Sequence, residues 1–496
     1  MEATPESQLR PQGPDFNARQ AEVASAGGNG LRPRLSVREA VSAMLALAAG
    51  LWLRLWMLGK FFEVNGDSLI YGGLAKNLLL HGRYALAGAG TETYPTLIRL
   101  PGYPLFLALC WRIFGMENYA SAAWVQIALE LAGCVLLADF AQRIAPQPSK
   151  RGVAQATLWL AALCPFTAIY AAQPLTEAPT LFTLAVALNA AARFRERPRW
   201  GSALAFTFAV TWAALLRPDG ALVGLALGLA MVAGAWRKNT EAVRKAERKS
   251  LLRICLTCVL LALAPFAVWT ARNWHVFHVF EPLAPRYATD PGEDTWPGWQ
   301  RWTKTWCLDF VSTYDVYWNV PGSTLDLTKL PARAFDSPSQ YAETAALAAD
   351  YNAGGQVFTH AIDLRFAKLA EDRIRARPLR YYVWLPLGRL ADMTLRPRVE
   401  NLPIDLDWWA YGRHKVETRF SWFYCGLNAL YLLLAAAGFC LCPRLWPWMV
   451  LYLALRGLLL MTIEAPEARY TLEFFPMFFA LGGVYAAWAV NRLRVS

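Results

Sequence analysis

Charged residues are scarce in this chain of 496 residues, because only 17% are Asp, Glu, Lys or Arg. Soluble globular domains carry about 25%, so the deficit argues against an ordinary soluble enzyme. Hydrophobic residues make up 56% of the chain, and they occur in runs long enough to cross a bilayer, which takes roughly 20 residues per helix. The composition therefore predicts an all-α membrane protein with several spans.

Several functional signatures are also absent from the sequence. It has no Gly-rich phosphate loop, no dinucleotide fingerprint and no zinc-ligand spacing. The five histidines form no cluster, and although Cys255 and Cys258 share a helix face, no second Cys or His pair accompanies them. The cofactor therefore stays unknown, and although a divalent metal is compatible with the sequence, no spacing indicates one. The net charge of +12 lies largely in short loops between apolar runs, where it sets membrane orientation, so we expect no nucleic-acid partner.

Ten apolar runs predict ten membrane spans. They lie at about 39–61, 119–142, 153–171, 178–193, 201–216, 219–236, 251–272, 418–442, 445–463 and 471–490. The first 36 residues are polar and rich in Pro, Gly and Arg, which predicts a disordered tail. No small-residue cleavage site follows the first run, so this run is interpreted as an anchor and not as a removed signal peptide.

Basic residues predict the orientation of these spans. Lys and Arg concentrate in alternate connections, and such connections face the cytoplasm. The connections placed inside, together with both chain ends, are 143–152, 194–200, 237–250 and 443–444. Residues 62–118 and 273–417 then both lie outside, together with the remaining short turns.

The predicted organisation has four parts. They are a cytoplasmic tail over 1–36, a membrane module over 37–272 with its first outside loop at 62–118, an outside segment over 273–417, and C-terminal helices over 418–496. Residues 378–395 are apolar but include Arg380, Arg389 and Asp392. We interpret them as an interfacial or re-entrant helix, because an extra span there would reverse the last three helices.

Once this topology is drawn, the unusual polar residues of the turns and loops fall on the predicted outside. Short hairpin turns need no charge, yet these outside loops and turns carry acids and arginines. They hold Asp67, Glu177, Arg217, Asp219, Glu464, Glu467 and Arg469, and Arg99 lies in the segment IRLPGYPLFLAL of the first outside loop. Ionisable groups at membrane depth are costly and indicate function. The pattern therefore predicts one shared polar site at the outer membrane surface.

Each of these residues also has a structural interpretation. Asp67 begins an amphipathic helix expected over 66–84, and Asp is a preferred N-cap, so capping outweighs catalysis on spacing alone. The two roles are compatible, because a helix N-terminus favours the anionic form. In the same structural interpretation, Glu177 is a first-turn acid, Arg217 and Asp219 form a local cap pair, and Arg469 and the first-span Arg54 extend to the membrane interface.

A set of motifs in order along the chain carries a family resemblance. The motifs are GD-x3-Y-x3-AKNLL-x-HGRY, RLPGYPLFLAL, LTEAP, LLRPDG and PEARY. Together they resemble the polyprenyl-phosphate-sugar-dependent glycosyltransferases of the GT-C class. The closest type is glycosyltransferase family 39, which holds the protein O-mannosyltransferases and the lipid A aminoarabinose transferase. The resemblance covers about 40–272 well and the last spans moderately, and it rests on the combination of motifs.

The resemblance implies a GT-C-like helical bundle with a catalytic acid in the first outside loop, where Asp67 stands. Glu177 matches the family's acidic position at the outer start of the fourth span, and Arg217 matches the basic position that ends the fifth. The aminoarabinose transferase has an acidic residue near the position of Arg99. This departure leaves the acceptor and any metal requirement open.

The implied reaction moves a sugar from a polyprenyl-phosphate carrier to a hydroxyl acceptor on a protein, lipid or glycan. It is a single inverting displacement in which Asp67 is the general base and Glu177 a second catalytic candidate. The candidates for phosphate or substrate binding are Arg217, Arg469, Arg99, Asp219, Tyr71, Glu467 and Arg54. Such an enzyme would lie in the bacterial inner membrane, among its lipids, with its site on the extracytoplasmic face.

Two other classes of function compete with this interpretation. A transporter or flippase of lipid-linked substrates also uses paired charges near helix ends. Transporters, however, usually place charges near the midplane in broken helices and often show repeated halves, and the sequence shows no internal repeat. A non-catalytic scaffold that displays 273–417 would leave the charged turns unexplained.

Overall fold

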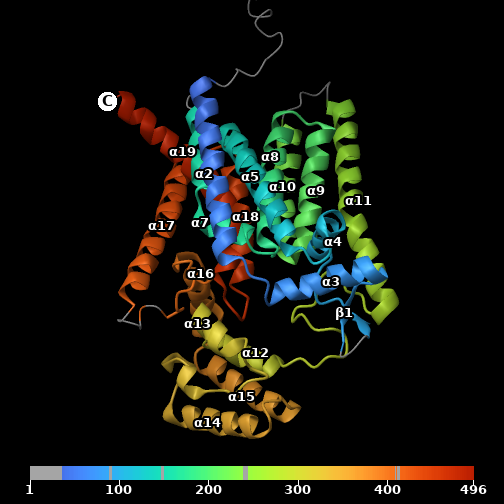
Figure 1. Ribbon diagram of the computed structural model, residues 1–496, viewed down its shortest axis with the longest axis vertical. Coiled ribbons are helices and arrows are strands. Elements are labelled where there is room, and N and C mark those ends of the chain that lie inside the picture. Colours follow the sequence, from blue (N-terminus) through green and yellow to red (C-terminus); the bar gives the residue numbers. More distant parts are fainter. Residues whose placement is uncertain are drawn as a thin grey trace, which may run out of the picture.

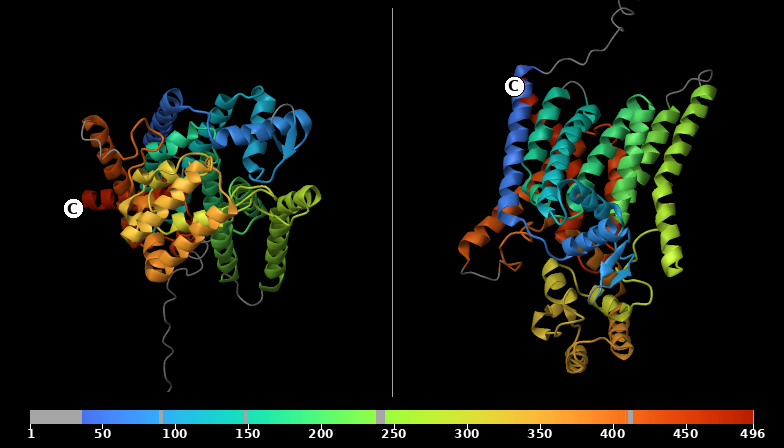
Figure 2. Two further views of the ribbon diagram at one scale, coloured as in Figure 1. Left: turned by 90° about the horizontal axis from the view of Figure 1, so that it is seen from below. Right: turned by 45° about the vertical axis from the view of Figure 1, so that its right-hand side comes forward.

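The structure of the chain is a computed structural model that describes residues 36–88, 92–146, 150–237, 244–407, 409 and 414–495. The predicted tail over 1–36 lies almost wholly outside these residues, as does 238–243 in the predicted inside connection. Long helices run side by side as a bundle, and a smaller group of helices lies at one end of it (Figures 1 and 2).

Every predicted span is occupied by helix. The helices are α2 (Val37–Phe61), α5 (Tyr119–Ile144), α6 (Lys150–Ala162) with α7 (Pro165–Ala171), α8 (Glu177–Glu196), α9 (Trp200–Leu216), α10 (Ala221–Arg237), α11 (Arg244–Phe277), α17 (Lys415–Cys440), α18 (Trp446–Leu460) and α19 (Phe475–Val495). Within the described ranges, five helices are long and apolar enough to cross a membrane, and the bent pair α6 and α7 makes a sixth. The all-α polytopic prediction is confirmed, although fewer helices meet this measure than the ten predicted.

The break between α6 and α7 has a local cause and a buried partner. Pro165 starts α7 and has no N–H to continue a helical hydrogen-bond ladder, and the two helices meet at a bend of 57°. The carbonyl of Ala162, at the end of α6, accepts a hydrogen bond from Arg54 Nη1 at 2.7 Å. Arg54 Nε also pairs with Glu130 Oε2 at 2.7 Å, so this fully buried guanidinium ties α2, α5 and α6 together.

The first predicted outside loop forms a compact unit. It contains α3 (Asp67–His81), β1 (Ala85–Ala87), β2 (Thr93–Pro95) and α4 (Gly102–Phe114), and the two strands pair antiparallel. The amphipathic helix predicted over 66–84 is α3, which buries Tyr71 and Leu74 and exposes Leu80. At the start of α4, a Cβ on Gly102 would lie 2.5 Å from the Leu215 carbonyl oxygen. This close approach brings the loop before α4 next to the end of α9.

The predicted outside segment forms a separate group of helices, which we call the helical body. It comprises α12 (Pro297–Lys304), α13 (Phe310–Ser312), η2 (Thr313–Tyr317), η3 (Leu327–Lys329), η4 (Ala332–Ala334), α14 (Pro338–Ala353) and α15 (His360–Ala376). Its own core is aromatic and includes Trp299, Trp302, Trp306 and Phe366. The helical body can therefore bury its apolar side chains without the bundle.

Residues 378–395 lie between the helical body and the bundle, as η5 (Arg380–Trp384) and α16 (Leu385–Leu395) (Figure 1). They are not among the candidate spans found in the described residues. Arg389 is fully buried and donates to the backbone carbonyl of Cys307 at 2.8 Å and to that of Lys304. This helix thus contacts the helical body through Arg389, and its Met393 packs with Leu460 and Phe474 of the bundle.

The two predicted outside segments lie at the same end of the bundle. In Figure 1, α3, β1 and the helices from α12 to α15 lie at the bottom, while α2 begins and α19 ends at the top. We call the bottom the site end. The turns around η1 (Pro218–Gly220) and η6 (Ala468–Phe474) are in contact through Arg217 and Glu473.

Candidate active site

Asp67, the first residue of α3, is held by two arginines. Its Oδ1 accepts from Arg99 Nη2 at 2.8 Å and its Oδ2 from Arg469 Nη2 at 3.3 Å. The N-cap position belongs to Gly66, and among the described residues no side chain caps this helix end, so the capping interpretation is wrong. Burial acts to raise the pKa of the Asp67 carboxyl, but the positive charges of Arg469 and Arg99 outweigh it and lower that pKa. Asp67 is therefore an anion at neutral pH.

The structure gives Arg99, from the first predicted outside loop, a place in the site. Its loop connects β2 to α4 and turns back toward the start of α3. The side chain of Arg99 is 23% exposed, and it is paired with Asp67. At this position the chain therefore brings a positive charge to the predicted base.

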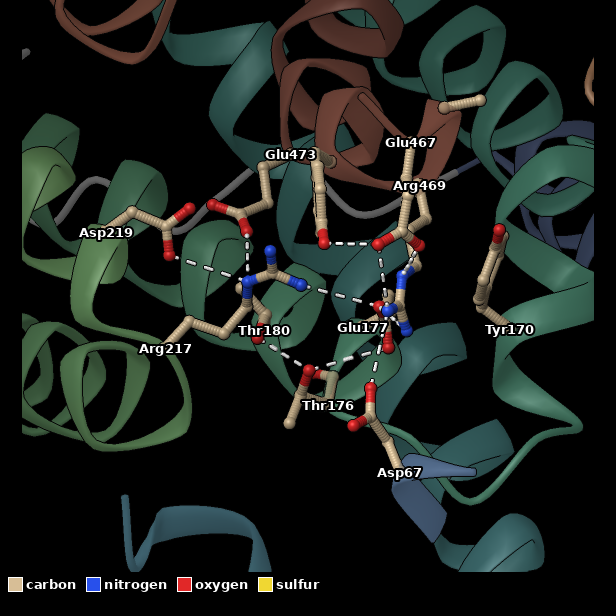
Figure 3. A network of polar contacts seen from close by, with 12 residues as sticks. Asp67, Tyr170, Thr176, Glu177, Thr180, Arg217, Asp219, Glu467, Arg469 and Glu473 are labelled. Carbon is tan, nitrogen blue, oxygen red and sulfur yellow. Dashed lines mark hydrogen bonds and ion pairs between the residues drawn. The ribbon is translucent and has the colours of Figure 1, made fainter. Parts of the chain in front are cut away.

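Arg469 connects three carboxylates that come from distant parts of the chain (Figure 3). Its Nε donates to Glu467 Oε2 at 2.6 Å, and its Nη1 lies 3.6 Å from Glu177 Oε1. Its third partner is Asp67. Glu467 also accepts a hydrogen bond from the hydroxyl of Tyr470. The turn before α19 is thereby linked to the first residues of α3 and α8.

Arg217, at the end of α9, lies among three further carboxylate contacts. Its guanidinium is 3.4 Å from Glu177, 3.5 Å from Asp219 and 3.5 Å from Glu473. The ring of Tyr470 lies beneath it, with the guanidinium carbon 5.2 Å from the ring centroid. Glu177, the first residue of α8, is shared by Arg217 and Arg469. The local cap pair considered for Arg217 and Asp219 is thus only one part of a larger network.

A fully buried arginine extends this network into the bundle. Arg456 Nη1 lies 2.7 Å from Asp219 Oδ2 and 2.6 Å from Glu473 Oε2. Its Nη2 donates to the carbonyl oxygen of Tyr470 at 2.8 Å. An arginine inside an apolar helix needs such partners, because an unpaired buried charge is strongly destabilising. Arg456 therefore holds Asp219 and Glu473 in place from the buried side of the network.

Exposure separates the arginines that can meet a ligand from those that cannot. The side chains of Arg99, Arg217 and Arg469 are 23%, 17% and 21% exposed, whereas those of Arg456 and Arg54 are fully buried. Arg54 is committed to Glu130 and to two backbone carbonyls. Of the predicted phosphate-binding arginines, Arg54 is thus the one that the structure does not bring into the site.

Tyr71 lies one turn beyond Asp67 on the buried face of α3. Its ring packs edge-on against Tyr103, with the ring centroids 5.0 Å apart. Burial and the nearby charge of Asp67 raise the pKa of Tyr71 to about 12. The tyrosine is therefore a neutral hydroxyl beside the carboxylate.

Glu473 and Tyr470, which both contact Arg217, were not predicted as site residues from the sequence, and neither was Arg456. Glu473 falls within the last predicted span, and a lone acid in an apolar run is a functional signal by default. That signal was present in the sequence. Tyr470 carries no comparable signal, because a tyrosine near a membrane interface is ordinary.

The site is built without metal-ligand clusters or disulfides, as far as the described residues extend. In that part of the chain, no group of three or more His, Cys, Asp or Glu residues is arranged to hold a metal ion. All nine cysteines are free. The site geometry thus consists of carboxylates, guanidinium groups and tyrosines.

Comparison with known protein families identifies the matching part of the chain. Residues 95–269 match the family described as dolichyl-phosphate-mannose-protein mannosyltransferase. The predicted resemblance is confirmed. The matched range contains Arg99, Glu177, Arg217 and Asp219, but it begins after Asp67. No curated protein matches the chain.

The solved structures that match this chain include two different proteins. ArnT from Cupriavidus metallidurans, bound to undecaprenyl phosphate, is 14% identical over 91% of this chain and 77% of its own, with a TM-score of 0.38. The oligosaccharyltransferase AglB from Archaeoglobus fulgidus, in complex with an inhibitory peptide and a dolichol-phosphate, is 10% identical over 92% of this chain, with a TM-score of 0.46. The match spans about half of the AglB chain, at 51%.

Proposed function

We propose that this chain is a membrane glycosyltransferase that moves a sugar from a polyprenyl-phosphate carrier to a hydroxyl acceptor. The observation that carries the proposal is the position of Asp67 at the site end, between Arg99 and Arg469. A carboxylate beside partly exposed arginines supplies both chemical needs of this reaction. One is a base for the acceptor proton, and the other is a set of cations for the phosphate that leaves.

The reaction is a single displacement at the anomeric carbon. The acceptor oxygen forms a bond to that carbon while the bond to the phosphate oxygen breaks, and Asp67 takes the proton of the acceptor hydroxyl. General base catalysis of this kind contributes roughly 10²–10⁴-fold. The polyprenyl phosphate leaves with the additional negative charge, and fixed guanidinium donors stabilise such oxygens.

Arg99, Arg217 and Arg469 are the proposed phosphate ligands, because each is partly exposed and close to Asp67 or Glu177. All three are already paired with carboxylates, so a donor phosphate has to exchange with those partners. The exchange has a useful consequence at Asp67. When Arg99 or Arg469 turns toward phosphate, its effect on the carboxyl weakens and the pKa of Asp67 rises. Donor binding would thus make Asp67 a stronger base.

The remaining site residues have supporting roles in this proposal. Glu177 holds Arg217 and Arg469 at a fixed separation and is the second catalytic candidate. Glu467 orients Arg469, and Asp219 orients Arg217. Tyr71 offers a neutral hydroxyl to the sugar or the acceptor. No metal is assigned.

The proposed location is the bacterial inner membrane, with both chain ends in the cytoplasm and the site on the extracytoplasmic face. The positive-inside pattern supports this orientation, and so does the position of the predicted outside segments at the site end (Figure 1). Charges gathered at one end of the bundle favour a surface reaction over transport through the midplane. The acceptor class stays open among proteins, lipids and glycans.

The proposal is tested with a panel of undecaprenyl-phosphate sugars, each tritiated in the sugar, added to membranes that contain the protein. We expect one donor to lose its label to another lipid, glycan or protein, and soluble nucleotide sugars to give no transfer. Membranes with Asp336→Asn serve as the matched control for membranes with Asp67→Asn, the variant of the proposed base. Asp336 is a paired carboxylate of the helical body, bound to Arg380, and should be dispensable. Direct transfer from a nucleotide sugar by purified protein would overturn the proposal.

A further inference from the structure

Arg272, near the end of α11, donates hydrogen bonds to the residues next to both strands, at the base of the hairpin formed by β1 and β2. Its Nη1 donates to the carbonyl oxygen of Thr96 at 2.9 Å, and its Nη2 to that of Tyr84 at 2.7 Å. The guanidinium also lies over the rings of Trp269, Phe277 and Tyr84, at 5.3, 5.3 and 5.6 Å from their centroids. A planar group held between rings and bound to two carbonyls is fixed in both position and direction.

The residues after Thr96 are held at successive backbone atoms. The N–H of Leu97 donates to Asp290 Oδ1 at 2.8 Å. The hydroxyl of Tyr84 donates to the carbonyl oxygen of Arg99 at 3.0 Å. Residues 96–99, which we call the Arg99 loop, are thus held at Thr96, Leu97 and Arg99 by groups from α11, the segment after α11 and the start of the hairpin.

We propose that Arg272 and Asp290 are positioning residues that set the distance between Arg99 and Asp67. This inference rests on the proposed role of Asp67 as the base. Both residues lie beyond 95–269, the range that matches the family. Residues after that range, including the segment that leads to the helical body, thereby contribute to the site without touching a reactant.

The physical argument concerns electrostatics as well as geometry. An opposite charge within about 4–6 Å lowers a carboxyl pKa by roughly 1–3 units, and the charge of Arg99 is one of the causes of the lowered pKa of Asp67. If the Arg99 loop moves, this effect weakens and the pKa of Asp67 rises. A displacement near 1 Å also costs roughly 10²-fold in rate. Loss of the contacts that Arg272 or Asp290 makes with the Arg99 loop should therefore change both the pH profile and kcat.

The test measures kcat/KM against pH, with the donor that the wild-type protein transfers, for Arg272→Lys, Asp290→Ala and Asp290→Asn. Lys at position 272 cannot bridge two carbonyls as the guanidinium does, and Ala at position 290 cannot accept the hydrogen bond of the Leu97 N–H. In both variants the acid limb of the kcat/KM profile, where activity falls as Asp67 becomes protonated, should therefore move to higher pH by up to about one unit. Asn keeps an acceptor oxygen, so Asp290→Asn should behave as wild type. The shift does not depend on how much protein folds, because lost protein lowers the rate equally at every pH.

A second measurement does not depend on activity. Hydrogen exchange of the peptide that contains Leu97 should be faster in Arg272→Lys and Asp290→Ala than in wild type. Arg333→Ala is the matched control, because Arg333 also donates to a backbone carbonyl, that of Trp306 at 3.0 Å, but within the helical body. It should change neither the exchange nor the acid limb.

Comparison with Arg99→Ala separates the two proposals. We expect this variant to raise the acid limb by itself and to hide any further shift from Arg272→Lys. If Arg99→Ala shifts the limb but Arg272→Lys and Asp290→Ala do not, the positioning roles are refuted and the proposed base survives. If Arg99→Ala leaves the limb unchanged, the electrostatic role of Arg99 at Asp67 fails, and the positioning inference fails with it.

Discussion

Replacement of Asp67 by Asn tests the chemistry with little change in shape. Asn keeps an oxygen that can accept from Arg99, but it has no charge and cannot take a proton at neutral pH. If Asp67 is the base, turnover should fall by roughly 10²–10⁴-fold. At about 1.4 kcal/mol for each tenfold, this is a loss of about 3–6 kcal/mol in transition-state stabilisation.

The effect on folding should be smaller than the effect on turnover. Both ion pairs of Asp67 are partly exposed, with 26% of its side chain accessible. Their loss should cost about 1.5–3 kcal/mol, the range for a hydrogen bond to a charged group. A typical folded domain has about 5–15 kcal/mol of stability, so the variant should still insert and fold. Catalytic loss and structural loss are therefore separable.

The assay compares transfer of tritiated sugar at saturating donor, with the amount of folded protein matched by size-exclusion chromatography in detergent. Asp67→Glu should recover little activity, because it keeps the carboxylate but moves it by about a bond length, and errors near 1 Å cost roughly 10²-fold. Turnover in Asp67→Asn close to that of wild type would refute the reasoning. The role of base would then pass to Glu177, the next carboxylate bound by Arg469.

Three further predictions concern two arginines of the site and one buried ion pair of the bundle. Arg469→Ala removes the charge that lowers the pKa of Asp67 most, so this pKa should rise and the acid limb of kcat/KM should move to higher pH. Arg217→Lys keeps the charge but loses the two-pronged geometry that suits phosphate, so turnover should fall about tenfold or more, and full activity in a transfer assay would show that Arg217 only anchors its helix. Glu130→Gln leaves Arg54 buried without its ion pair, which should cost roughly 3–5 kcal/mol of stability and lower the melting temperature in detergent. An unchanged melting temperature would contradict the structural role of the Arg54–Glu130 pair.

The spans and the clustering of polar turns could be predicted from the sequence because their signals are local. A run of about 20 apolar residues specifies a membrane helix without reference to its neighbours, and the predicted runs are helices α2, α5 to α11 and α17 to α19. The basic residues of each connection likewise predict, without reference to the rest of the chain, on which side of the membrane that connection lies. Asp67, Glu177, Arg217 and Arg469 could thus be placed in one region before their contacts were known.

The partners of these residues are decided by the tertiary structure. Asp67 and Arg469 are 402 positions apart, and spacing along the chain carries no information about such a pair. The sequence placed Arg54 among the phosphate ligands, but packing of α2 against α5 gives it to Glu130. Packing of α18 likewise places Arg456 beside Asp219 and Glu473. Ion pairs depend on distances of a few ångströms between side chains, and only the packed bundle sets those distances.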